Sequence, residues 1–152
     1  MIIRSINEAL KGKPFHTIAP EKTLREAALV LRQTDAGALA VMDDAKLVGI
    51  LCERDIVHRA ICEHRPMDGT TVADVMTQNP TLIEATASLA SAMKTMIDGG
   101  FRHAPVVNNG KPIGMLSMRD IPTEYRLMFE RFAEAKAGPQ QYERLTSAPL
   151  MM

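Results

Sequence analysis

The stretch Lys46–Ile56, KLVGILCERDI, returns 65 residues later as Lys111–Ile121, KPIGMLSMRDI. Six of these eleven positions are identical, and the glycine, the arginine and the aspartate keep their spacing. The match extends backwards, so that residues 24–56 align with residues 89–121 and nine of 33 positions agree. A sequence that repeats at a fixed period is built from copies of one structural unit. The chain is therefore predicted to contain two copies of one fold unit in tandem.

Composition and charge exclude several classes of protein. The chain has 152 residues, with 18 Lys and Arg against 18 Asp and Glu. This balance argues against a protein that binds nucleic acid or an anionic membrane mainly through phosphates. The most apolar segment, residues 36–42, is too short to span a bilayer. With no signal-peptide pattern and too few cysteines for a disulfide framework, the sequence predicts a cytoplasmic protein.

The first copy predicts a fixed order of elements. A short extended piece at residues 15–18 precedes a helix, which Thr23 and Glu26 open with the spacing of a capping box. Two apolar runs typical of buried strands follow at residues 38–42 and 47–51. A second helix begins shortly after the second run.

The second copy predicts the same order. An extended piece lies at residues 81–83, and a helix spans about residues 87–97. Strands are expected at residues 104–107 and 112–116, joined by Asn109-Gly110, a pair that favours a two-residue hairpin turn.

Segments outside the aligned copies complete the pattern. A short helical turn with the capping form precedes each copy, at residues 5–8 and 71–74. Helical periodicity also continues after Asp120, with an apolar stripe made of Ile121, Tyr125, Met128, Phe129 and Phe132. We expect this long helix to cover the open side of the second copy or to pack on another chain. Residues 138–152 show little periodicity and form a predicted flexible tail.

The two copies should pack against each other. A unit of about 55 residues cannot readily bury its apolar faces alone. The predicted fold is therefore an α/β body of two pseudo-twofold related repeats, residues 1–65 and 70–137, each a small sheet with two helices on one face. A cleft is expected where the copies meet.

The repeated Gly-x-x-x-x-Arg-Asp motif is the main candidate for chemistry. A predicted strand ends and a helix begins between Gly114 and Asp120, so free N–H groups and the positive end of the helix dipole suit an anion there. Local capping by Ser117 and Asp120 is the alternative interpretation. In the first copy Cys52 replaces the capping hydroxyl, yet Asp55 is still present. A carboxylate can also accept hydrogen bonds from vicinal hydroxyls such as those of ribose.

The span from residue 5 to residue 125 resembles a tandem pair of cystathionine-beta-synthase (CBS) domains, also called a Bateman module. Five stretches carry the resemblance, three from the first copy and two from the second: Thr17–Pro20, Gly37–Val41, Leu47–Ile56, Phe101–Val107 and Gly114–Ile121. The resemblance covers about four fifths of the chain.

The resemblance implies regulatory binding of AMP, ADP or ATP, and in some members S-adenosylmethionine or NAD. It implies that Asp120 or Asp55 holds the ribose and that Ser117 contacts phosphate. Cationic side chains would serve the phosphates, and the adenine would lie against the short opening strands. The residues implied for these two roles are Arg102 and His103 for phosphate, and Thr17, Ile18, Thr81 and Leu82 for adenine. Arg54 and Arg119 of the repeated motif are further candidates for nucleotide binding.

The resemblance also implies that each site crosses the pair, so that Asp120 works with the first opening strand and Asp55 with the second. Two differences between the copies predict unequal sites. Cys52 replaces the usual Ser or Thr, and Gly37-Ala38 stands where the second copy has Arg102-His103. We expect the Asp120 site to be the tighter one for a phosphorylated nucleotide.

No catalytic motif and no metal-ligand spacing occurs in the sequence. Cys52, Cys62, His58 and His64 include no tight ligand pair, so we expect no metal site. Searches for nucleophile elbows, phosphate loops and zinc-protease motifs find none, so we expect no enzyme and no required cofactor. The predicted function is a homodimeric adenine-nucleotide sensor acting on a separate partner. The alternatives are a module for NAD(H) or S-adenosylmethionine, or a ligand-free protein-interaction adaptor.

Overall fold

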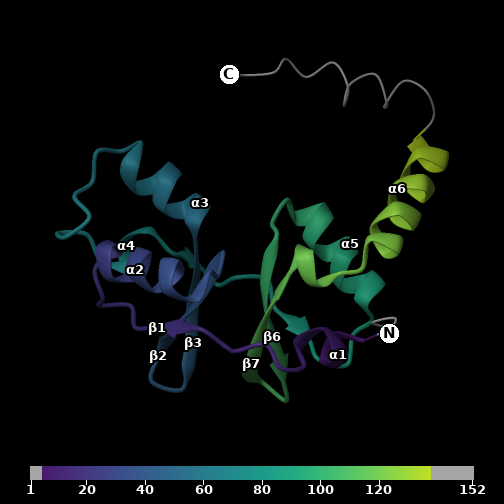
Figure 1. Cartoon of the computed structure of the whole chain (residues 1–152), viewed down its shortest axis with the longest axis horizontal. Coiled ribbons are helices and arrows are strands. Elements are labelled where there is room, and N and C mark those ends of the chain that lie inside the picture. Colours follow the sequence, from purple (N-terminus) through teal and green to yellow (C-terminus); the bar gives the residue numbers. More distant parts are fainter. Residues whose placement is uncertain (1–4, 138–152) are drawn as a thin grey trace.

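A β-hairpin forms the centre of each half of the molecule. The computed structural model describes residues 5–137, and Figure 1 shows the two halves side by side with both hairpin turns at the same end. β2 (Ala38–Asp43) pairs antiparallel with β3 (Lys46–Cys52), and β6 (His103–Asn108) pairs antiparallel with β7 (Lys111–Ser117). The four strands predicted from the apolar runs are therefore confirmed, each to within one residue at either end.

The turn chemistry explains one of these hairpins directly. Asn109 and Gly110 both have positive φ, at 51° and 78°. A two-residue hairpin loop of this kind matches the right-handed twist of the flanking strands, and Asn-Gly tolerates it best. Both hairpins also contain a register shift at the equivalent place, between Val41 and Met42 and between Val106 and Val107. The shared irregularity shows that the two copies keep the same backbone path.

Short strands extend each hairpin into a mixed sheet. β1 (Thr17–Ile18) runs parallel to β2, and β5 (Ile83–Glu84) runs parallel to β6. β4 (Thr77–Gln78) pairs antiparallel with β3, so the first sheet has the order β1-β2-β3-β4 and the second has the order β5-β6-β7. The predicted α/β fold with two small sheets, each packed with helices, is confirmed.

One long helix packs on each sheet. α2 (Leu24–Thr34) starts at Thr23, whose N–H donates to Glu26 Oε2 at 2.9 Å while Glu26 N–H donates to Thr23 Oγ1 at 3.2 Å. This is the predicted capping box. α5 (Leu89–Gly99) has Ser88 as its N-cap and begins about two residues later than the sequence predicted. Both helices bury one apolar face against their own sheet: Leu24, Ala27 and Leu31 in α2, and Leu89, Ala92, Met93 and Met96 in α5.

The short helices ahead of the two copies exchange partners. α1 (Ile6–Leu10) places Ile6 in the core of the second half, and α4 (Val72–Val75) contributes both of its valines to the core of the first half. Isolated bridges from Ser5 to Ser88 and from Thr23 to Thr71 join the same pairs of segments. Each core thus contains residues from both predicted repeats, 1–65 and 70–137. The boundaries of these repeats stay a prediction.

The repeated glycine of the motif lies where the short helix from ahead of the other copy approaches the sheet. A Cβ on Gly114 would lie 3.0 Å from Leu10 Cδ1, and a Cβ on Gly49 would lie 2.7 Å from Met76 Sδ. Since both distances are shorter than ordinary van der Waals contact, glycine lets the crossing chain approach each sheet closely. A third apolar cluster, made of Ala38, Ala40, Ile50 and Met115, joins the two hairpins.

The two copies differ after the motif. In the first, α3 (Glu53–Ile56) runs on into the π-helix η1 (Val57–Ile61). In the second, a single 3₁₀ turn, η2 (Met118–Asp120), is followed by extended Ile121, and α6 (Thr123–Ala137) begins only after Pro122. The prediction of one unbroken helix after Asp120 is wrong, because proline keeps the preceding residue out of helical conformation. Val57 stands at the equivalent place in the first copy, and there the helix continues.

The predicted apolar stripe of the last helix is also only partly correct. Tyr125 and Phe129 pack against the second core, whereas the Met128 residue is 67% exposed. The Phe132 side chain and the predicted tail at 138–152 lie outside the described residues. Within the part of the chain that the structure describes, every helix is too short or too polar to cross a membrane.

The exchange of α1 and α4 predicts crossed effects on local stability. Ile6→Ala removes a fully buried side chain from the second core, which costs roughly 2 to 5 kcal/mol of unfolding free energy. We expect amide hydrogen exchange to accelerate first in β5–β7 for Ile6→Ala. The matched variant Val72→Ala should accelerate exchange in β1–β3 instead. Faster exchange in the first half for Ile6→Ala would contradict the assignment of the cores.

Candidate functional site

The Asp120 carboxylate lies between the two halves. Its Oδ2 accepts a hydrogen bond from Ser117 N at 2.8 Å and lies 2.5 Å from Lys13 Nζ. Lys13 also donates to the Met115 carbonyl oxygen at 3.0 Å. The Asp120 side chain is 20% exposed and the Lys13 side chain 33% exposed. Solvent therefore reaches this ion pair, although most of it is sheltered.

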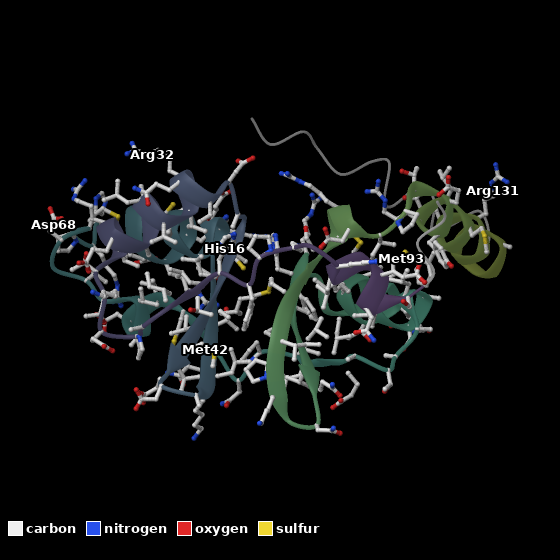
Figure 2. All side chains as sticks on the ribbon, turned by 60° about the horizontal axis from the view of Figure 1, so that its bottom comes forward. His16, Arg32, Met42, Asp68, Met93 and Arg131 are labelled. Atoms are coloured by element: carbon white, nitrogen blue, oxygen red, sulfur yellow. The ribbon has the colours of Figure 1, made fainter. Side chains whose placement is uncertain are left out.

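Sequence reasoning missed Lys13. It lies on the segment that runs from α1 to β1, so a residue ahead of the first copy reaches the carboxylate of the second. In the sequence Lys11 and Lys13 look alike, and only the crossing of the chain distinguishes them. Figure 2 shows His16, three residues further along, between the two halves, where its carbonyl oxygen accepts from Ala40 N.

Asp120 and several basic side chains lie close enough to His103 to affect its charge, and of these Arg102 and Arg119 are exposed to solvent. His103 begins β6, Arg102 precedes it, and Arg119 belongs to η2. The pKa of His103 is lowered from 6.5, chiefly because burial disfavours the charged imidazole and also because Lys13 and Arg119 repel it, while Asp120 acts in the opposite direction. The structure thus brings together the predicted residues Asp120, Ser117, Arg102, His103 and Arg119, and it adds Lys13.

The position of His103 depends on a residue of the first copy. A Cβ on Gly37 would lie 2.8 Å from His103 Nε2, so only glycine leaves the imidazole in its place. Gly37 aligns with Arg102, and its lack of a side chain is what allows the imidazole of the second copy to approach. The imidazole at this site therefore comes from one copy and the space for it from the other.

The local conformation at Ser117 corrects one expectation. The predicted helix start is a single 3₁₀ turn of three residues, in which Arg119 N donates to Ser117 Oγ at 3.3 Å. So short a turn aligns too few peptide dipoles to attract an anion by itself. Side chains, rather than a helix end, provide the positive charge here.

The first copy builds a related arrangement around Asp55. Asp55 Oδ2 accepts from Cys52 N at 2.9 Å, and Asp55 Oδ1 lies 4.0 Å from Arg59 Nη1. Arg59 Nη1 also donates to the carbonyl oxygens of Val75 and Met76, both at 3.1 Å. Sequence reasoning missed this arginine, because its place on the π-helix decides which way it faces. The Asp55 side chain is 13% exposed, and the predicted site residue Arg54 is exposed to solvent.

Cys52 behaves as a small apolar residue. It packs against the cluster that joins the hairpins and makes no side-chain capping hydrogen bond. Burial, together with the nearby Asp55 carboxylate, raises the pKa of the Cys52 thiol to about 12. The thiol is therefore protonated at neutral pH, whereas Cys62 is exposed. Among residues 5–137 no three His, Cys, Asp or Glu side chains gather to form a metal site.

The residues expected at adenine lie in two hollows. Thr17 and Ile18 line a hollow of about 370 Å³ together with Lys22, Glu26 and Val30. Leu82 lines a larger, open groove of about 690 Å³ with both hairpin turns, whereas Thr81 is exposed and is not part of that lining. Neither lining includes Asp55 or Asp120, so neither hollow coincides with the two motif aspartates. The arrangement around Asp120 depends on particular side chains, whereas an open groove between two hairpin turns needs none.

Both halves match one family of domains. The family model described as "CBS domain" matches residues 7–61 and residues 72–124. The chain belongs to the CBS-domain family. The predicted tandem CBS pair is thereby confirmed. Each match supplies the hairpin and the long helix of one half, while the short helices α1 and α4 pack on the half built mainly from the other match.

Several CBS proteins are similar to this chain. CBS domain-containing protein CBSCBSPB5 of Arabidopsis thaliana is 36% identical over 67% of this chain, which spans 19% of that protein's length. An uncharacterized 17.7 kDa protein of Acidianus ambivalens is 34% identical over 70% of this chain and 64% of its own. A solved CBS domain protein from Pyrobaculum aerophilum, complexed with AMP, superposes with a TM-score of 0.73 at 27% identity, covering 87% of this chain and 100% of its own.

The surroundings of His103 predict an unusual titration. We expect its imidazole to lose its proton below pH 6.5, the ordinary value, because desolvation and nearby cations disfavour the charged form. Since the unfolded chain then binds a proton more readily than the folded one, stability should fall as the pH drops from about 6.5 towards the folded pKa.

Imidazole NMR signals followed against pH measure this midpoint, and His103→Asn identifies the signal by its loss. In the same variant the free energy of unfolding should decrease less as the pH falls below about 6.5. A His103 midpoint at or above 6.5 would contradict the environment described here.

Proposed function

We propose that this CBS pair is a regulatory module that binds an adenine nucleotide of the AMP, ADP or ATP type at Asp120 and acts on a separate partner. One observation carries the proposal: a partly exposed carboxylate lies between the two halves within a group of cationic side chains. Membership of the CBS family and the AMP-bound relative from Pyrobaculum support it.

The chemistry of the site fits the parts of a nucleotide. Among the described residues, hydrogen bonds to the Asp120 carboxylate use Oδ2, and Oδ1 can accept a ribose hydroxyl. Lys13, Arg102 and Arg119 bring three positive charges against the one negative charge of Asp120. This surplus suits a phosphate, since hydrogen bonds between charged groups are the stronger ones. The hydroxyl of Ser117, at the base of η2, would be a further contact.

The Asp55 site is proposed as the weaker one for a phosphorylated ligand. Cys52 presents a protonated thiol in place of a hydroxyl, and Arg59 is already bound to the carbonyl oxygens at the end of α4. The Asp55 side chain is also less exposed than that of Asp120. A less charged adenosine ligand, or none, fits this arrangement better.

A ligand-free adaptor is the second candidate function, and one observation favours it. The Asp120 carboxylate has a structural role that needs no ligand, because it accepts a hydrogen bond from Ser117 N and pairs with Lys13. In both candidates we propose a regulatory role, which the two CBS matches at residues 7–61 and 72–124 support.

Ligand binding separates the two candidates. A panel of AMP, ADP, ATP, NAD, NADH and S-adenosylmethionine is tested by thermal unfolding and then by calorimetry. A ligand present at one hundred times its dissociation constant stabilises the folded protein by about 2.7 kcal/mol. We expect an adenine nucleotide to produce such a shift. If no compound of the panel shifts the midpoint, the adaptor function replaces the sensor.

Asp120→Ala and Asp55→Ala form a matched pair for assigning the site. Each variant removes one acceptor of a backbone N–H at the start of the turn, from Ser117 and from Cys52 respectively. Both variants thus lose the same kind of capping hydrogen bond. A difference between them in nucleotide affinity then shows which aspartate contacts the ligand. We expect Asp120→Ala to abolish the main shift and Asp55→Ala to preserve most of it. Equal losses would contradict the unequal sites.

We also propose that the module is a homodimer that associates through its helices. Large apolar side chains remain 40% to 67% exposed on several helices, away from the groove at the hairpin turns. They are Leu29 of α2, Val57 and Ile61 of η1, Ile97 of α5, and Leu127 and Met128 of α6. Burying such a set against a second copy removes apolar surface from water, which favours association.

Charge placed on α6 should separate the dimer. We expect the double variant Leu127→Glu with Met128→Glu to lower the mass in sedimentation equilibrium from twice 16.7 kDa to 16.7 kDa. The matched double variant Leu82→Glu with Ile113→Glu changes apolar residues of similar exposure outside the helices and should remain dimeric. A wild-type protein that sediments as a monomer would refute the proposed dimer.

A further inference from the structure

We propose that Lys13 is a charge-selective latch on the Asp120 site. In the unliganded molecule its ammonium group holds the Asp120 carboxylate, and on binding it moves to the phosphate of the ligand. The site thereby selects a phosphorylated nucleotide over the same nucleoside without phosphate. This inference rests on the proposed function, and it adds a specificity-determining residue that neither the repeat nor the motif indicates.

The Lys13–Asp120 pair is a close contact between distant parts of the chain. The Arg25–Asp68 and Lys94–Asp98 pairs lie on the surface, with every side chain at least 57% exposed. In the Arg59–Asp55 pair, which joins residues four positions apart, the side chains are 50% and 13% exposed and the atoms lie 4.0 Å apart. The Lys13–Asp120 pair is 33% and 20% exposed, and it joins residues 107 positions apart. Surface pairs contribute little to stability, whereas a sheltered pair interacts through a medium that screens it less. The Lys13 ammonium is therefore a strong local charge.

Only one of the two sites has this lysine. Lys13 follows the N-cap Ser5 of α1 by eight positions, and the residue eight positions after Thr71, the N-cap of α4, is Asn79. An uncharged amide stands at the equivalent place of the crossing segment. The latch thus belongs to the Asp120 site alone, the site that also carries Arg102 and His103.

When a ligand binds Asp120, the Lys13 ammonium needs a new negatively charged partner. Asp120 Oδ1 can accept one ribose hydroxyl, but the vicinal second hydroxyl competes with the Lys13 ammonium for Oδ2. A nucleoside has no negative charge with which the displaced Lys13 ammonium could pair. The cost of weakening the Lys13–Asp120 ion pair therefore lowers the affinity for a nucleoside. A nucleotide offers its phosphate, which restores a charged hydrogen bond. Lysine suits the exchange because its ammonium is a point charge on a flexible stem, and the Met115 carbonyl can retain one of its donors.

A purely structural role for Lys13 makes a different prediction. If Lys13 only ties the crossing segment to the second half, its loss disturbs the site for every ligand alike. If it is a latch, its loss changes the ratio of the affinities for AMP and adenosine. The ratio therefore distinguishes the two roles, while the affinity for one ligand alone does not.

The experiment compares adenosine, AMP and ATP by isothermal titration calorimetry on the full chain. The wild type is measured beside Lys13→Met, which keeps the length of the stem, and Lys13→Arg, which keeps the charge. Lys11→Met, an exposed lysine on the same segment, is the matched control. We expect Lys13→Met to reduce the preference for AMP over adenosine by about tenfold or more, where tenfold corresponds to about 1.4 kcal/mol. Adenosine itself should bind as tightly as before or more tightly.

Lys13→Arg should restore most of the preference, and Lys11→Met should leave it unchanged. An unchanged ratio in Lys13→Met, with all three compounds weakened equally, would overturn the latch and leave the proposed function intact. Failure of the wild type to bind any of the three compounds would count against the proposed nucleotide site itself, and the latch would be rejected with it. Thermal midpoints of all variants check that each remains folded.

Discussion

Neither half of this molecule can cover its own sheet, and most of its architecture follows from that constraint. The core of each half is completed by a short helix that precedes the other copy in the chain, with Ile6 completing the second core and Val72 and Val75 completing the first. To reach those cores the chain must cross between the halves twice. The crossings pass over Gly49 and Gly114, where any side chain would collide with Met76 or Leu10. The repeated glycine is thus a consequence of packing.

The same crossings create the candidate site. The segment from α1 to β1 brings Lys13 to the carboxylate of Asp120, and the segment from α4 to β4 offers its carbonyl oxygens to Arg59 beside Asp55. Each acidic side chain therefore meets a cation, but from a different source. At Asp120 the cation comes from the segment between α1 and β1, far away in the sequence, and at Asp55 from η1, which directly follows the helix that contains the aspartate. The two sites are alike in backbone and unlike in charge.

Local sequence signals were enough to predict most elements of the fold, although the two-residue strand β4 was missed. The apolar runs place the four main strands to within one residue, and Thr23 with Glu26 fixes the start of α2. These features depend on neighbouring residues and on burial, which are visible in a single sequence. The helix after Asp120 was predicted incorrectly because its apolar periodicity outweighed Pro122, a local signal that the pattern contained. The resemblance to a CBS pair then selected Asp120, Ser117, Arg102 and His103, which the structure brings close together. Lys13 and Arg59 could not be found in this way, since their roles depend on the crossing of the chain and on a π-helix.

The close approach of His103 to Gly37 has a consequence for how the two copies can change. Gly37 is the counterpart of Arg102, so one copy has a basic side chain where the other has none. A side chain at position 37 would displace the imidazole of His103. A substitution in the first copy would thus change the surroundings of an aspartate that belongs to the second.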